Sequence, residues 1–180
     1  MIEPLSIHSP VSEPRFRLYQ WTGNCLCFLV FRSGPWFSLG PDCPLCLCVL
    51  AIMCGFAGIF RTLMAPFAGA EMRILGTVVI ASVIGFYLLT ALKDAGIEPR
   101  AYRADTEQCP KCGAARSPDT FHCNICEVCI RKLDHHCPLT GKCIGEGNIR
   151  YFYSFLLSLF LFVCYGVLWG LVSTSPNLAD

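Results

Sequence analysis

The sequence predicts an all-α integral membrane protein with three transmembrane helices and a small cytosolic cysteine-rich domain of short β-hairpins. Of its 180 residues, 54% are apolar and only 15% are charged, with a mean hydropathy of +0.51. The apolar residues lie in long uncharged runs, and seven of the 14 cysteines and three of the four histidines fall within 35 residues. This composition argues against a disordered chain and against a purely soluble domain. The net charge of +1 gives no electrostatic case for binding nucleic acid.

Three uncharged runs are long enough to cross a bilayer, which takes about 20 helical residues. The first run covers residues 43–60, and we extend the helix to 43–65 because the long side chain of Arg61 can reach the membrane surface. The second predicted helix covers 74–92. The third begins after Arg150 and covers 151–173 of a run that continues to residue 179.

The distribution of lysine and arginine predicts how these helices are oriented. Nine of the 14 basic residues lie between Lys93 and Arg150, and such an excess marks the cytosolic side. Residues 93–150 are therefore predicted to form a cytosolic cysteine-rich domain, and 1–42 a cytosolic leader. Within this leader, residues 1–20 are expected to be flexible and polar, and Cys25–Phe31 to lie at the membrane interface. The segments 66–73 and 174–180 are then a short lumenal loop and a short lumenal tail.

The cysteine cluster could be a disulfide framework or a metal-binding domain. Disulfides need an oxidising compartment and usually an even number of cysteines, whereas this cluster has seven, interleaved with three histidines. Paired C-x-x-C spacing with nearby histidines is typical of zinc sites, so we favour zinc. The other seven cysteines lie in or beside apolar segments, and we interpret them as ordinary membrane packing. Lipidation of Cys25, Cys27 or Cys46 stays open as an alternative.

The number of candidate ligands exceeds what two zinc ions need. Seven cysteines and three histidines give ten ligands, and two closed tetrahedral sites use eight. One cysteine and one histidine left over would have the composition of a nucleophile and its base. In an extended stretch, His135 and Cys137 point one way and His136 the other. The arithmetic alone does not fix which two residues remain.

The pattern C-x2-C-x9-H-C-x2-C-x2-C-x4-D-H-H-C-x5-C-I-G-x-x-N, from Cys109 to Asn148, closely resembles the DHHC-type protein S-acyltransferases, or palmitoyltransferases. Phe152 and Asp94-Ala95-Gly96 also match positions of that family. The resemblance implies two structural Zn²⁺ ions that stabilise the domain. It assigns the first zinc to Cys109, Cys112, His122 and Cys129, and the second to Cys123, Cys126, His136 and Cys143.

The resemblance also implies a chemistry, with palmitoyl-coenzyme A as acyl donor. Cys137 would be the nucleophile, His135 the general base and Asp134 the residue that orients it. Lys132, Lys142 and Arg150 are candidates for the coenzyme A phosphates, although the positive-inside bias explains these three residues equally well. The implied partners are the lipid bilayer, acyl-CoA and membrane-associated proteins with cytosolic cysteines. An oligomer is left open. The family suggests the Golgi or endoplasmic reticulum, with the plasma membrane as an alternative.

Two departures from the family pattern leave other functions open. Leu139 stands where the family usually has tryptophan, and we expect a chain that lacks the family's fourth transmembrane span. The main alternative is therefore a catalytically weak or inactive zinc-binding membrane scaffold, a truncated relative of the family. A membrane ubiquitin ligase with a cross-braced zinc domain is a further alternative, but it leaves Asp134-His135-His136-Cys137 unexplained.

Overall fold

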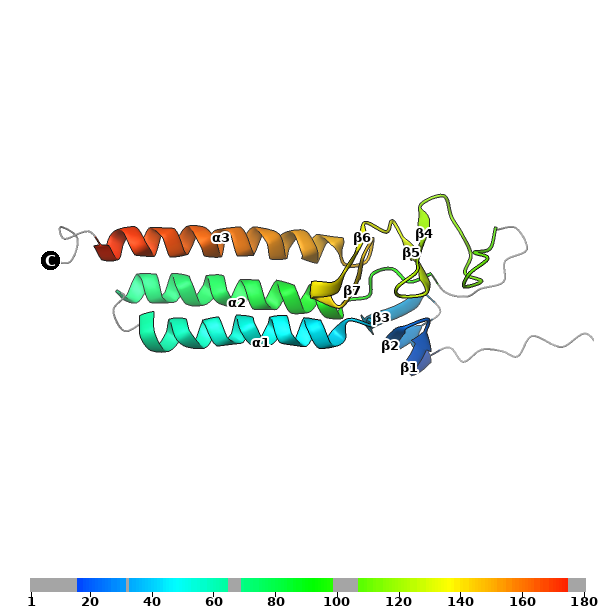
Figure 1. The fold of residues 1–180 in the computed structure, drawn as a ribbon, viewed down its shortest axis with the longest axis horizontal. Helices are drawn as coiled ribbons and strands as arrows, with labels where there is room; N and C mark the ends of the chain where they lie inside the picture. Colours follow the sequence, from blue (N-terminus) through cyan, green and yellow to red (C-terminus); the bar gives the residue numbers. More distant parts are fainter. Residues whose placement is uncertain (1–15, 32, 65–68, 99–106, 175–180) are drawn as a thin grey trace, which may run out of the picture.

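The computed structural model describes residues 16–31, 33–64, 69–98 and 107–174. Three long helices lie side by side, and the strands gather at one end of them (Figure 1). Helix α1 covers Cys43–Ile59 and continues into a π-helical turn, Phe60–Met64; α2 covers Ala70–Leu92 and α3 Ile149–Thr174. Each helix is long and apolar enough to cross a membrane.

Two helices begin earlier than their uncharged runs. Helix α2 starts at Ala70, four residues before the expected position 74, and Glu71 lies in its first turn. A carboxylate in the first turn interacts favourably with the helix dipole, so the helix can begin with charged residues. A start predicted from the uncharged run alone leaves these residues out. Helix α3 starts at Ile149 rather than 151. Of the expected loop 66–73, residues 66–68 lie outside the described residues and 70–73 belong to α2. Residues 175–180 of the expected tail 174–180 also lie outside the described residues.

Helix α2 packs closely along α3. The Tyr165 hydroxyl donates a hydrogen bond to the Met72 carbonyl (3.0 Å), and the Tyr165 ring stacks edge-on against Phe60 at 5.8 Å. A Cβ at Gly76 would lie 2.5 Å from both the Phe60 ring and the Tyr165 hydroxyl, so this close approach requires glycine. Many large apolar side chains of the three helices remain exposed on the outside, as expected of a surface that faces lipid.

A three-stranded antiparallel sheet precedes α1. Its strands are β1 (Phe16–Thr22), β2 (Cys25–Phe31) and β3 (Gly34–Leu39), in that order. The expected flexible leader is therefore wrong for residues 16–20, and Cys25–Phe31 is the central strand rather than an isolated interfacial segment. Residues 1–15 lie outside the described residues. Gly23 allows the tight β1–β2 turn because it adopts a positive φ of 56°.

The cysteine-rich segment between α2 and α3 contains short hairpins, as the sequence predicts. Strand β4 (Thr120–Cys123) pairs with β5 (Val128–Arg131), and β6 (His135–Cys137) pairs with β7 (Lys142–Ile144). A short 3-10 turn, Pro138–Thr140, connects β6 to β7. Below, residues 93–150 are called the insert, of which 99–106 lie outside the described residues.

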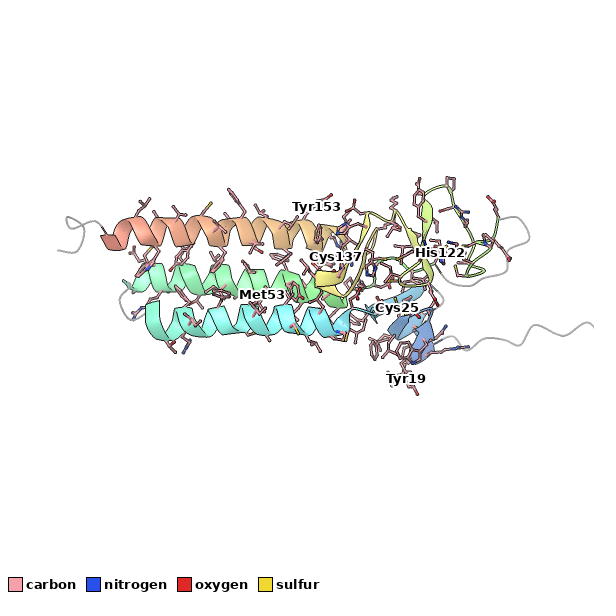
Figure 2. The ribbon with its side chains drawn as sticks, in the orientation of Figure 1. Tyr19, Cys25, Met53, His122, Cys137 and Tyr153 are labelled. Atoms are coloured by element: carbon pink, nitrogen blue, oxygen red, sulfur yellow. The ribbon has the colours of Figure 1, made fainter. Side chains whose placement is uncertain are left out.

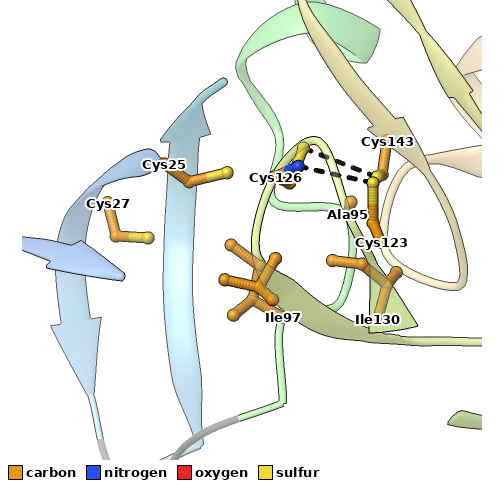
Figure 3. Close-up of a cluster of buried hydrophobic side chains, with 9 residues drawn as sticks. Cys25, Cys27, Ala95, Ile97, Cys123, Cys126, Ile130 and Cys143 are labelled. Atoms are coloured by element: carbon orange, nitrogen blue, oxygen red, sulfur yellow. Dashed lines mark hydrogen bonds between the residues drawn. The ribbon is translucent and has the colours of Figure 1, made fainter. Parts of the chain in front are cut away.

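The sheet and the insert share one small core (Figure 3). Cys25 and Cys27 are buried on strand β2 and face Ile97 and Ile130 of the insert. The interpretation of these two cysteines as membrane packing is therefore wrong: they pack inside the domain at the end of the helices. Burial raises the pKa of the Cys27 thiol to about 11, which keeps it protonated and apolar.

Candidate metal centres and nucleophile strand

The structure gathers the eight expected zinc ligands into two sets. The first metal set is Cys109, Cys112, His122 and Cys129, and the second metal set is Cys123, Cys126, His136 and Cys143. Within each set, one potential ligand atom from every residue lies within 4.8 Å of the others. The sets interleave along the chain because β4 contributes neighbouring residues to both.

The first metal set is built from one turn and one hairpin. His122 and Cys129 are directly paired across β4 and β5, so their side chains lie on the same face. Gly113 closes the turn that carries Cys109, with a positive φ of 70° and a hydrogen bond from its N–H to the Cys109 carbonyl. Burial by itself would raise the pKa of Cys109, but hydrogen bonds from the Cys112 and Lys111 backbone N–H groups and from the Cys129 and Cys112 thiols together lower it to about 7.

The second metal set combines both hairpins. Cys123 and Cys126 come from β4 and the turn after it, while His136 and Cys143 are directly paired across β6 and β7. The His136 Nδ1 atom lies 3.6 Å from the Cys123 sulfur, 3.4 Å from Cys126 and 3.6 Å from Cys143. Hydrogen bonds from Cys143 and then Cys25 lower the pKa of Cys126, which favours the thiolate form that binds metal.

The distances within both sets fit a tetrahedral zinc ion. Zn–S bonds of about 2.3 Å and Zn–N bonds of about 2.0–2.1 Å place neighbouring ligand atoms roughly 3.5–3.8 Å apart. In the first metal set, His122 Nδ1 lies 3.7 Å from the Cys109 sulfur and 3.8 Å from the Cys129 sulfur, and the sulfurs of Cys112 and Cys129 are 3.5 Å apart. Each set could therefore hold one metal ion, with three sulfur ligands and one nitrogen ligand.

The other ring nitrogen of His136 contacts a residue for which the sequence predicts no role at the metal sites. The His136 Nε2 atom lies 2.7 Å from the Asp42 carboxylate, across 94 positions of the sequence. Asp42 immediately precedes α1, so its position in the sequence suggests a helix cap rather than a contact with the insert. Only the tertiary structure brings the two residues together.

Strand β6 also carries the expected nucleophile and base. The His135 Nδ1 atom lies 2.8 Å from the Asp134 carboxylate, and the His135 ring packs edge-on against Phe152 at 5.3 Å. Cys137 is buried, with 8% of its surface exposed, at the point where the insert meets the helices (Figure 2). Because side chains alternate along a strand, His135 and Cys137 fall on the face opposite to His136.

The turn after Cys137 is held by both of the first two helices. The Tyr87 hydroxyl of α2 lies 2.7 Å from the Leu139 carbonyl and 2.9 Å from the Cys46 carbonyl of α1. The Asp42 N–H donates to the Gly141 carbonyl at 3.3 Å. Sequence analysis missed Tyr87, because a tyrosine within an apolar run gives no signal of a contact with a distant turn.

The three candidate coenzyme A residues differ in their surroundings. Lys142 is 2% exposed, and its ammonium group donates to the Ser38 carbonyl (2.6 Å), the Ser38 hydroxyl (3.0 Å) and the Lys93 carbonyl (2.7 Å). Burial lowers the pKa of Lys142 to about 8. The expectation that Lys142 binds coenzyme A is therefore wrong, since the ammonium group is enclosed by other partners. Lys132 and Arg150 are exposed.

The cysteine-rich segment is similar to a known protein family. Residues 103–179 match the model of the family described as DHHC palmitoyltransferase. Human palmitoyltransferase ZDHHC18 is 29% identical over 150 residues, which cover 59% of this chain and 38% of the relative. Human palmitoyltransferase ZDHHC9 is 49% identical over 57 residues, which cover 32% of this chain and 16% of the relative. The chain thus spans well under half the length of these curated relatives.

Proposed function

We propose that this chain is a protein S-palmitoyltransferase of the DHHC type, because residues 103–179 match the DHHC palmitoyltransferase family model and the similar curated proteins are palmitoyltransferases. It moves a long-chain acyl group from acyl-coenzyme A to cysteines of other proteins through an S-acyl intermediate on Cys137. The observation that carries this proposal is the alternation along β6. One histidine of the strand faces the thiols of the second metal set, while the other is paired with a carboxylate and shares a face with Cys137.

The reaction follows from this arrangement. The contact of His135 Nδ1 with Asp134 leaves Nε2 free to accept the Cys137 thiol proton. The resulting thiolate attacks the thioester carbonyl carbon, a new carbon–sulfur bond forms, and the bond to the coenzyme A sulfur breaks. The proton on His135 then neutralises the leaving thiolate. In the second half-reaction, His135 takes the proton of the substrate cysteine, whose sulfur forms a bond to the acyl carbon as the bond to Cys137 breaks. His135 then returns the proton to the Cys137 sulfur.

An apolar cavity between the helices supports an acyl chain as the transferred group. The cavity measures about 310 Å³, and side chains of all three helices line it. Its α3 wall includes Phe155, which packs edge-on against Tyr87 at 5.5 Å. Since the Tyr87 hydroxyl reaches the turn after Cys137, this tyrosine connects the cavity to the nucleophile strand. An acyl chain bound to Cys137 can bury its methylene groups there.

The two zinc ions have a structural role in this proposal. The first and second metal sets would hold one ion each, and closed sites of three thiolates and one histidine leave no open position for a substrate. When bound, zinc supplies the folding energy of a domain that has little apolar core. Lys132 and Arg150 remain candidates for the phosphates of coenzyme A, on the side where basic residues are concentrated.

Autoacylation tests the proposal. The purified full chain is incubated with labelled palmitoyl-coenzyme A beside Cys137→Ser, and hydroxylamine release identifies a thioester. We expect label on the wild type and none on Cys137→Ser, with two zinc ions retained by both. Cys164→Ser is the matched control, because it removes an exposed thiol of α3 and should label normally. Absence of label on a folded wild type that holds two zinc ions would instead favour the zinc-binding scaffold.

A further inference from the structure

Both edges of the His136 ring are held. Its Nδ1 atom faces the three thiols of the second metal set at 3.4–3.6 Å, and its Nε2 atom lies 2.7 Å from the Asp42 carboxylate. The His136 side chain is 9% exposed and the Asp42 side chain 36% exposed, so the imidazole half of this contact is shielded from water. Asp42 belongs to the start of α1, whereas His136 belongs to the insert. The contact therefore joins a candidate metal site to the first apolar helix.

Asp42 makes this contact instead of capping its own helix. Aspartate at the N-cap normally accepts a hydrogen bond from the second or third helical N–H, and that bond typically contributes about 1 kcal/mol. In α1 the Asp42 side chain makes no such bond, and Pro44 within the first turn has no N–H to offer. The carboxylate turns toward the insert, while the Asp42 carbonyl still accepts the Cys46 N–H. A capping role alone does not explain why the Asp42 carboxylate points toward His136 rather than toward the N–H groups of α1.

The chemistry of a metal-binding histidine explains what the carboxylate does. Neutral imidazole carries its proton on one nitrogen and offers the lone pair of the other. A carboxylate at Nε2 accepts that proton's hydrogen bond and leaves the Nδ1 lone pair for the metal. The same bond fixes the plane of the ring. Here the ring belongs to the residue immediately before Cys137, so its orientation also determines how β6 sits against α1.

We propose that Asp42 is a positioning residue that holds His136 in its metal-binding tautomer and fastens the nucleophile strand to the start of α1. The backbone bond from Asp42 to Gly141 reinforces the same attachment on the other side of the turn after Cys137. The part of this inference that concerns Cys137 rests on the proposed function. The part that concerns the second metal set does not, and it is tested by metal retention alone.

The test compares three substitutions of Asp42 in the full chain. Asp42→Ala removes the contact and offers no capping side chain, Asp42→Ser offers a good capping side chain without the reach to His136, and Asp42→Asn keeps a neutral acceptor. Zinc retention is measured by competition with a chromophoric chelator. Cobalt substitution reports the coordination geometry through its absorption spectrum. We expect one of the two ions to bind 10–100-fold more weakly in Asp42→Ala and Asp42→Ser, with Asp42→Asn in between.

The matched control is Asp134→Asn, which makes the same change in the neighbouring Asp–His pair, whose histidine lies outside both metal sets. It should leave zinc affinity unchanged. Wild-type zinc retention in Asp42→Ser would show that Asp42 acts only as a helix cap and would overturn the inference, as would unchanged retention in Asp42→Ala. If Asp42→Ala fails to fold, the comparison of Asp42→Ser with Asp42→Asn decides. A wild type that binds two zinc ions but never autoacylates refutes the proposed function without affecting this result.

Discussion

The two metal sets have the same ligand composition but different connections to the rest of the molecule. The first takes its four ligands from residues 109–129 and lies in the outer part of the insert, where Figure 2 shows His122 farther from the helices than Cys137. The second takes its ligands from both hairpins, and its histidine contacts the residue that precedes α1. The comparison indicates that the first set holds the insert together, whereas the second also connects the strand of Cys137, the proposed nucleophile, to the start of α1.

The largest expected effect is that of removing a ligand from the second metal set. In Cys126→Ser, the site loses a buried thiol at the centre of the shared core, and we expect zinc content to fall from two ions to one or fewer. Autoacylation should disappear, because β6 loses its anchor. Elemental analysis and limited proteolysis measure the two effects. If Cys126→Ser holds a single zinc ion and still labels normally, the second metal set does not have the special role in acylation that we assign to it.

A smaller loss is expected when the nucleophile strand is altered with both metal sets intact. Asp134→Asn removes the charge that orients His135, and general-base catalysis typically contributes 10²–10⁴-fold to a rate. We expect the autoacylation rate to fall by roughly 10²-fold with zinc unchanged at two ions. Rapid-quench labelling gives the rate. A simultaneous loss of zinc would mean that the two histidines of β6 do not have separate roles.

Removing a ligand from the first metal set should reduce acylation only in part. Cys112→Ser affects the turn that faces β5, while the hairpin of β6 and β7 and the contact with Asp42 remain. We expect one zinc ion to be lost and the labelling of Cys137 to fall several-fold rather than to zero. The same zinc and labelling assays apply. Complete loss of labelling would show that the insert folds as one unit and that the outer site is equally essential.

The smallest expected effect concerns two lysines of the insert. Lys142→Met leaves the carbonyls of Ser38 and Lys93 without a donor, which costs about 1–3 kcal/mol of stability, so the unfolding temperature should fall. Lys132→Met removes one exposed contact with Glu146 and should leave that temperature unchanged. Thermal unfolding in detergent compares the two. If both substitutions change the unfolding temperature equally, the buried contacts of Lys142 with Ser38 and Lys93 do not stabilise the protein as we expect.

Local patterns in the sequence determined most of the architecture. Uncharged runs predict the three helices, because a bilayer-spanning helix needs only length and apolar side chains. C-x-x-C spacing predicts metal ligands, because two thiols three residues apart can bind one ion from a tight turn. The assignment of these ligands to two particular sets came from the resemblance to a family, and the distances in the structure fit those sets.

The strands before α1 could have been predicted, because the turn at Gly23-Asn24 separates two runs rich in aromatic and apolar residues. The contact of Asp42 with His136 and the burial of Lys142 could not. Each depends on segments about 50 to 100 positions apart meeting in space. The neighbouring residues in the sequence do not distinguish a buried lysine from an exposed one. They also do not distinguish an aspartate that caps a helix from one that orients a histidine. Only the packing of the sheet and the insert onto the helix ends decides between them, because it determines which polar groups lose water and must find partners in the protein.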